Sequence, residues 1–80
     1  MPRWRTLTET ERKKLASKLR QAREEAGMTQ REVAGALGIP QSTISELENA
    51  QRRLDVAEMI VLGELYQKTP AWFLAEIVRL

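Results

Sequence analysis

A row of polar side chains between positions 41 and 46 is the part of the chain best suited to chemistry. Ile44 and Leu47 recur at helical spacing and should face inward, which leaves the polar residues between them outside. These polar residues are Gln41, Ser42, Ser45 and Glu46. The chain has no histidine and no cysteine, which excludes disulfides, the usual zinc sites and His-dependent acid-base catalysis. The row is therefore suited to hydrogen-bonded recognition, and we expect neither an enzyme nor a metal or cofactor.

Two short helices are expected to position this row. Thr29 and Glu32 have the spacing of a capping box that opens a first helix over 30–37, which Gly38 can end in the left-handed conformation. Pro40 suits the start of a second helix over 41–49. Ala34 is small enough to let the two helices cross closely. The pattern predicts two helices joined at a sharp, fixed angle.

The rest of the chain shows the same start and stop signals. A capping box at Thr8 predicts a helix that runs to about Ala26, a third one at Asp55 predicts a helix that runs to about Tyr66, and Thr69 followed by proline opens a last helix towards the C-terminus. We expect either Trp72 or Phe73 to close the core. Eighty residues allow one domain, so we predict an all-α bundle of five helices over 8–80, preceded by a basic arm over 1–7.

The run GMTQREVAGALGIPQSTISELENAQRR resembles the helix-turn-helix of the phage-repressor and Cro (XRE-type) family of DNA-binding domains. The resemblance covers roughly residues 12–76 and implies a lambda-repressor-like bundle with its helix-turn-helix at 30–49. Two positions depart from the family pattern. Pro40 stands where the family often has a capping Ser or Thr, so the cap is weaker or the helix begins one residue early. Ala50 replaces the usual glycine, so a left-handed residue falls on Asn49 or is strained on Ala50.

The resemblance implies contacts of two kinds with double-stranded DNA. It places Gln41 where the family's glutamine reads a base, and the amide suits adenine; Ser42 and Ser45 are secondary readers. Glu46 can only accept a hydrogen bond from cytosine N4, so it either reads cytosine or discriminates against wrong sequences. The expected phosphate contacts are Gln30, Thr43, Asn49, Arg52 and Arg53, with a thymine methyl as the alternative contact of Thr43. The resemblance also implies a partly buried ion pair between Arg23 and Glu48.

The charge of the chain is unevenly distributed. Residues 1–23 contain eight basic and two acidic side chains (+6), and residues 24–80 contain five and nine (−4), which gives the overall +2. One cationic end suits a polyanion, although it is also typical of a solvated helix face. The arm is either disordered or docked through Trp4, and Arg3 and Arg5 are candidates for phosphate contacts.

The C-terminal run AWFLAEIVRL contains more apolar residues than one small domain can bury, so we predict a subunit interface built from Leu74, Ile77, Val78 and Leu80; a loosely ordered terminus is the alternative. No apolar run approaches a membrane span, and no signal-peptide core is found, so we expect no membrane contact and a cytoplasmic protein.

The main hypothesis is a homodimeric transcriptional regulator, in particular a repressor, on a palindromic operator. A restriction controller, the antitoxin of a toxin-antitoxin pair, and an interaction module for another protein on the same scaffold remain alternatives.

Overall fold

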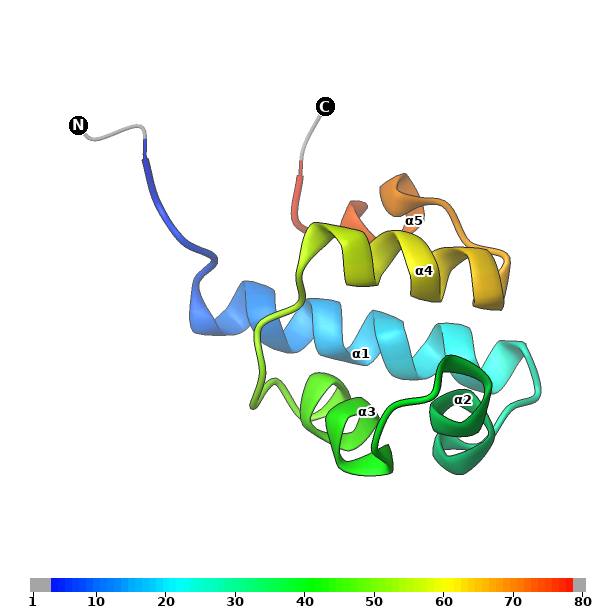
Figure 1. The fold of residues 1–80 in the computed structure, drawn as a ribbon. Coiled ribbons are helices and arrows are strands. Elements are labelled where there is room, and N and C mark those ends of the chain that lie inside the picture. Colours follow the sequence, from blue (N-terminus) through cyan, green and yellow to red (C-terminus); the bar gives the residue numbers. More distant parts are fainter. Residues whose placement is uncertain (1–3, 79–80) are drawn as a thin grey trace.

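The computed structural model describes residues 4–78, and within them it contains five helices and no strand (Figure 1). The helices are α1 (Glu9–Glu25), α2 (Gln30–Leu37), α3 (Gln41–Glu48), α4 (Val56–Tyr66) and α5 (Pro70–Leu74). This confirms the all-α class and the five elements that the sequence predicts. The first four helices end within a residue of the predicted positions, whereas α5 is only five residues long.

Local hydrogen bonds explain where the helices begin. The capping boxes predicted at Thr8, Thr29 and Asp55 are all present. Thr69 caps α5 by accepting from the backbone N–H of Trp72 at 3.2 Å. Pro40 is the exception, because it caps α3 without any side-chain hydrogen bond. The second of the two alternatives for Pro40, an earlier start of the helix, is wrong, because α3 begins at Gln41.

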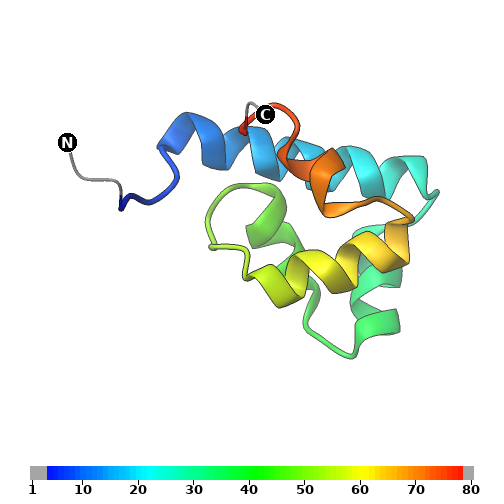
Figure 2. The same cartoon turned by 90° about the horizontal axis from the view of Figure 1, so that it is seen from above.

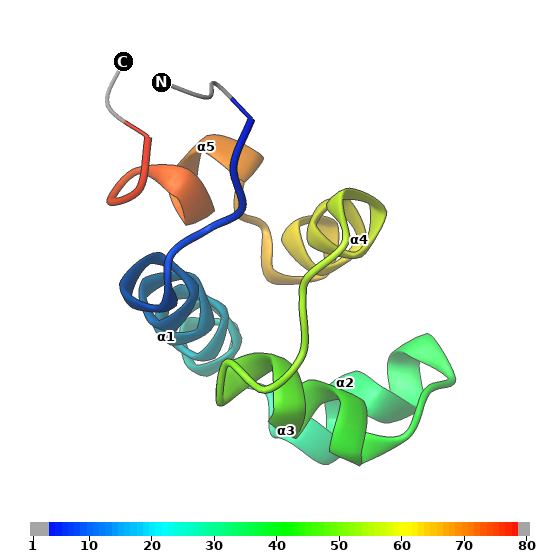
Figure 3. The same ribbon diagram turned by 90° about the vertical axis from the view of Figure 1, so that its left-hand side faces the viewer.

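The core lies between α1 and the other helices. Figure 3 looks roughly along α1, which lies at the left of the view. It shows α3 below α1, α5 above α1, and α4 to the right. In Figure 2, α5 lies over α1 and beside α4, and it contacts both helices. Phe73 is the fully buried residue that α5 contributes, and Val33 and Ile44 are the other large side chains with almost no exposed surface. Phe73 rather than Trp72 therefore closes the core.

Trp72 has a different environment from Phe73. Its ring meets the Phe73 ring edge-on, with centroids 5.3 Å apart, and remains half-buried. The ammonium groups of Lys18 and Lys68 lie 4.2 and 4.6 Å from the centre of the indole. Lys68 also pairs with Glu25 at 2.7 Å. Trp72 thus joins α1 to the connection between α4 and α5 through stacked cations.

The C-terminal apolar residues are placed differently from what their sequence pattern predicts. The helix ends at Leu74, and the backbone N–H groups of Ile77 and Val78 both donate to the Leu74 carbonyl, so the chain turns back. Leu74 and Ile77 consequently pack against the core, and Val78 is exposed. Leu80 lies outside the described residues. Leu74 and Ile77 are therefore only partly exposed, and Val78 is the exposed member of the predicted interface among the described residues.

The N-terminal arm is attached to the domain through Arg5. Its guanidinium donates to both carboxylate oxygens of Glu11, at 2.7 and 3.2 Å. This hydrogen bond, together with the capping bond from the Thr8 N–H, lowers the pKa of Glu11 to about 2. Trp4 does not dock on the described part of the domain, because 92% of its surface is exposed. Arg3 lies outside the described residues.

Ala50 carries the left-handed conformation that follows α3. Its φ is +58°, whereas Asn49 has a φ of −108°, so the second of the two alternatives for this turn is the observed one. Because a Cβ in this region is strained and glycine is not, we expect Ala50→Gly to raise the free energy of unfolding by about 0.5–1 kcal/mol, after allowing for the entropy of glycine. Urea unfolding measures this difference.

The exposed Ala36 in α2 is the matched control, because there the same substitution enters an ordinary helical position. We expect Ala36→Gly to lower the free energy of unfolding by about 0.5–1 kcal/mol. If both substitutions lower it equally, Ala50 is not strained.

Candidate nucleic-acid interface

The helix-turn-helix is held at its turn by Gly38. This residue has φ +67° and ψ +35°, and its N–H donates to the Ala34 carbonyl. The next N–H, from Ile39, donates to the same carbonyl at 3.1 Å. Ala34 is buried and small, so α2 and α3 pack closely against each other. The angle at which α3 is presented is therefore fixed by backbone hydrogen bonds and packing.

The outer face of α3 carries the four residues that the sequence predicts to read bases. Gln41 and Ser42 are exposed, and Ser45 and Glu46 follow one turn later, half-exposed. Residues at these intervals share one side of a helix. Thr43 lies off this side, in an apolar groove between the turn and α4. The structure thus brings the four predicted base readers together and separates Thr43 from them.

Asn49 connects the end of this face to α1. Its side-chain amide donates to the Ser45 carbonyl at 2.8 Å and to Ser45 Oγ at 3.3 Å. Its Oδ1 accepts from Arg20 Nη2 at 3.5 Å. Ser45 is therefore held from one side by Asn49, and this Asn49 amide is already engaged within the domain.

Glu48 is the buried charged residue behind the interface. Only 1% of its side-chain surface is exposed. Arg23 Nε donates to Glu48 Oε2 at 2.7 Å and Arg23 Nη2 donates to Oε1 at 3.0 Å, so the predicted ion pair is present as a bidentate contact. Arg23 Nη1 also donates to the Met28 carbonyl at 2.8 Å, so the pair ties α3 to both ends of the α1–α2 connection.

Two further residues converge on Glu48. Gln30 Nε2 donates to Glu48 Oε1 at 3.1 Å, and Arg20 Nε lies 3.7 Å from the same oxygen. The pKa of the nearby Tyr66 hydroxyl is raised to about 12, mainly because the group is buried and also because Glu48 is negatively charged. Tyr66 therefore remains neutral. The carboxylate thus joins residues of α1, α2 and α3 in one polar joint inside the domain.

The position of Gln30 combines structural and binding features. It is the first residue of α2, where free backbone amides and the helix dipole favour an anion. One hydrogen of its amide is directed at Glu48, which orients the side chain. Gln30 is therefore held in place at a helix end that suits a phosphate.

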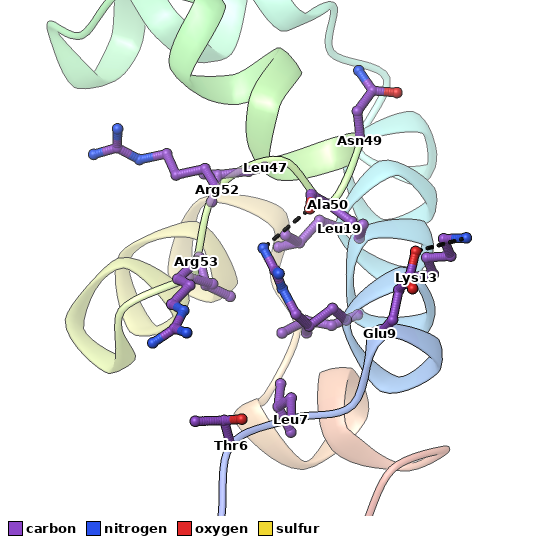
Figure 4. A pocket seen from close by; sticks show the side chains of 14 residues that line it. Thr6, Leu7, Glu9, Lys13, Leu19, Leu47, Asn49, Ala50, Arg52 and Arg53 are labelled. Atoms are coloured by element: carbon purple, nitrogen blue, oxygen red, sulfur yellow. Dashed lines mark hydrogen bonds and ion pairs between the residues drawn. The ribbon is translucent and has the colours of Figure 1, made fainter.

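The loop between α3 and α4 separates the other predicted phosphate contacts. Figure 4 shows that Arg52 and Arg53 leave the loop on one side and Asn49 on the other. Arg52 lies 4.0 Å from Glu58, and the loop is fixed by Arg12, whose Nη2 donates to the Ala50 carbonyl at 3.1 Å. The loop residues, Arg12 and their neighbours on α1 and the arm surround a groove of about 580 Å³. The structure therefore does not bring Asn49 together with the two arginines.

Arg20 is a residue of the site that the sequence reasoning missed. It contacts both Glu48 and Asn49 from the exposed side of α1. The available signal was its spacing, because Arg20 precedes Arg23 by three residues and so lies beside it on the same helix. A second arginine at that interval is placed where it can reach the same acidic partner.

Two kinds of site are not found among residues 4–78. No group of acidic side chains there could hold a metal ion, and no helix there is long and apolar enough to cross a bilayer.

The comparisons with known proteins agree with this geometry. A family model described as helix-turn-helix matches residues 19–73, which includes α2, α3 and the Arg23–Glu48 pair. No curated protein and no solved structure matches the chain significantly. The matched part begins within α1 and ends in α5, and thus covers most of the domain. The chain belongs to the helix-turn-helix family of the phage-repressor and Cro type, and it is a DNA-binding regulator.

Proposed function

We propose that this regulator is a sequence-specific transcriptional repressor that binds a palindromic operator as a homodimer. The observation that carries the proposal is the polar face of α3, which a buried ion pair holds rigid from behind. The helix enters the major groove, where side chains near its N-terminus reach base edges. A repressor needs no other activity than occupation of its operator.

Each residue of the α3 face has a proposed role at the base edges. Gln41 pairs with adenine N6 and N7 through its amide, and such a contact contributes about 1–3 kcal/mol of discrimination. Ser42 and Ser45 contact further base edges. Glu46 accepts from cytosine N4, and elsewhere in the groove its charge is repelled by phosphates.

Phosphate contacts position the domain without reading sequence. Gln30 supplies one from the start of α2, and Thr43 supplies another from the first turn of α3. Arg52 and Arg53 extend from the next loop, on a different side from Asn49. The contacts thus approach the backbone from more than one direction, which fixes the orientation of α3 in the groove.

The homodimer follows from the size of the interface. One small module buries too little surface to bind both tightly and selectively, and a two-fold pair doubles its contacts on a palindrome.

A second candidate function is binding of another protein, for instance the toxin of a toxin-antitoxin pair. The exposed apolar side chains of α4, Val56 and Ile60 among them, favour this candidate.

Selection of bound sequences from a random pool of duplex DNA tests the proposal. We expect a two-fold symmetric consensus with half-sites about ten base pairs apart. Affinity for that consensus should fall steeply with salt, by about 0.9 log units per log unit for each phosphate contacted. Recovery of an asymmetric consensus would contradict the dimer, and a pool without enrichment would contradict sequence-specific binding.

A further inference from the structure

Helix α4 exposes a stripe of apolar side chains on the face turned away from the core. Val56, Ala57, Ile60 and Val61 form this stripe, and they share one side of the helix because they lie at intervals of one, four and five residues. Val56 is 67% exposed and Ile60 is 46% exposed. The opposite side of α4 is buried in the core through Met59 and Leu62. A helix that is apolar on both sides is typical of one that is covered on both sides.

A groove of about 460 Å³ extends the stripe towards the helix-turn-helix. Val61 and Ala57 line it from α4, and Leu37 at the end of α2 and Ile39 in the following turn line it from the other side. Leu37 and Ile39 are both only half-buried within one chain. The apolar surface is therefore shaped, with Val56 protruding at one end and a groove beside Val61 at the other.

We infer that this stripe binds the same stripe of a second copy, with the two α4 helices antiparallel about a two-fold axis; the inference depends on the homodimer proposed above. Along α4, the point midway between Val56 and Val61 is also midway between Ala57 and Ile60. A two-fold axis through that point therefore places Val56 of each copy opposite Val61 of the other. The protruding valine then enters the partner's groove.

Charge favours a second copy over another protein. The antiparallel arrangement also places the start of each α4, which Arg53 precedes, beside the end of the other α4, which carries Glu64. Both residues are exposed, and neither forms an ion pair within residues 4–78. The ends of the stripe are thus complementary to themselves only in the antiparallel arrangement. This pairing takes Arg53 away from the phosphate contacts, and it also removes Thr43, which lines the filled groove. The phosphate contact of the loop is then left to Arg52.

Sedimentation equilibrium without DNA tests the inference on three forms of the full chain. We expect the unaltered chain to dimerise at micromolar concentration, Ile60→Glu to dimerise at least tenfold more weakly, and Val78→Glu to dimerise as the unaltered chain does. Val78 is the matched control, because it is the exposed apolar residue of the C-terminal interface predicted from sequence. Circular dichroism checks that both variants keep their helices.

Exchange of the end charges provides the second test. Arg53→Glu or Glu64→Arg alone opposes like charges and should weaken dimerisation by roughly tenfold or more, and the double exchange should restore it. Failure of the double exchange to restore dimerisation overturns the antiparallel pairing. Dissociation by Val78→Glu while Ile60→Glu remains dimeric overturns the α4 interface but leaves the homodimer. A chain that stays monomeric at all concentrations overturns the homodimer itself, whether or not another protein binds α4.

Discussion

Replacing Arg23 with alanine is expected to lower the free energy of unfolding by about 3 kcal/mol. Removing one partner of a buried ion pair costs about 3–5 kcal/mol, because the other charge is left in a poorly solvated site. Glu48 keeps its hydrogen bond from Gln30 and its contact with Arg20, so the loss should fall at the lower end of that range. Chemical unfolding at neutral pH measures the difference.

Arg20 is the matched control for Arg23. It approaches the same carboxylate from the same helix, but at 3.7 Å and with 48% of its side chain exposed. Exposed ion pairs contribute about 0–1 kcal/mol, so Arg20→Ala should cost less than about 1 kcal/mol. The double variant Arg23→Ala with Glu48→Ala should lose less than the sum of its parts, because no charge is stranded. Equal losses for Arg20→Ala and Arg23→Ala would show that the bidentate contact does not hold α3.

Gln41→Ala is expected to remove sequence preference rather than general affinity. The substitution deletes a directional contact with one base edge, which should cost about 1–3 kcal/mol on the selected operator and little on random DNA. Competition binding with operators altered at single positions measures this loss. We expect one position of each half-site to become tolerant of all four bases.

Arg52→Ala serves as the comparison for Gln41→Ala. Without its phosphate contact, the variant should bind all sequences more weakly to about the same degree, and the log-log salt slope should fall by about one unit for each phosphate that is no longer bound. Sequence preference should stay the same. If Gln41→Ala instead weakens binding to all DNA alike, α3 is not the helix that reads the sequence.

Most of the fold is predictable from sequence because its signals are local. Capping boxes at Thr8, Thr29 and Asp55 and the glycine at 38 fix the ends of helices through groups only a few residues apart. The Arg23–Glu48 pair is more distant in sequence, and only the family resemblance indicates it. Such a pair leaves no local pattern, because its partners meet only after α1 and α3 pack.

The features that the sequence does not predict correctly depend on packing between distant segments. Apolar content suggests a long C-terminal helix, but the turn after Leu74 directs Ile77 back to the core. Apolar residues recur on more than one face of α4, and only the packing shows which of them are buried, because α4 has one side against α1 and α5. Trp4 is a candidate anchor for the arm by its size, but Arg5 is the observed anchor because a capping glutamate lies nearby.

The hydrogen bond from Asn49 to Ser45 determines which base groups Ser45 can recognise. A serine hydroxyl can both donate and accept, so an unconstrained serine distinguishes base edges poorly. Ser45 Oγ already accepts a hydrogen bond from the Asn49 amide at 3.3 Å, which fills one of its two lone pairs and leaves its own hydrogen available to a base edge. In the major groove we expect it to donate to guanine O6 or N7, adenine N7 or thymine O4 in preference to accepting from cytosine N4, because one of its acceptor positions is already filled. Ser45 and Glu46 would then form an adjacent donor and acceptor that together suit the two members of a G·C pair.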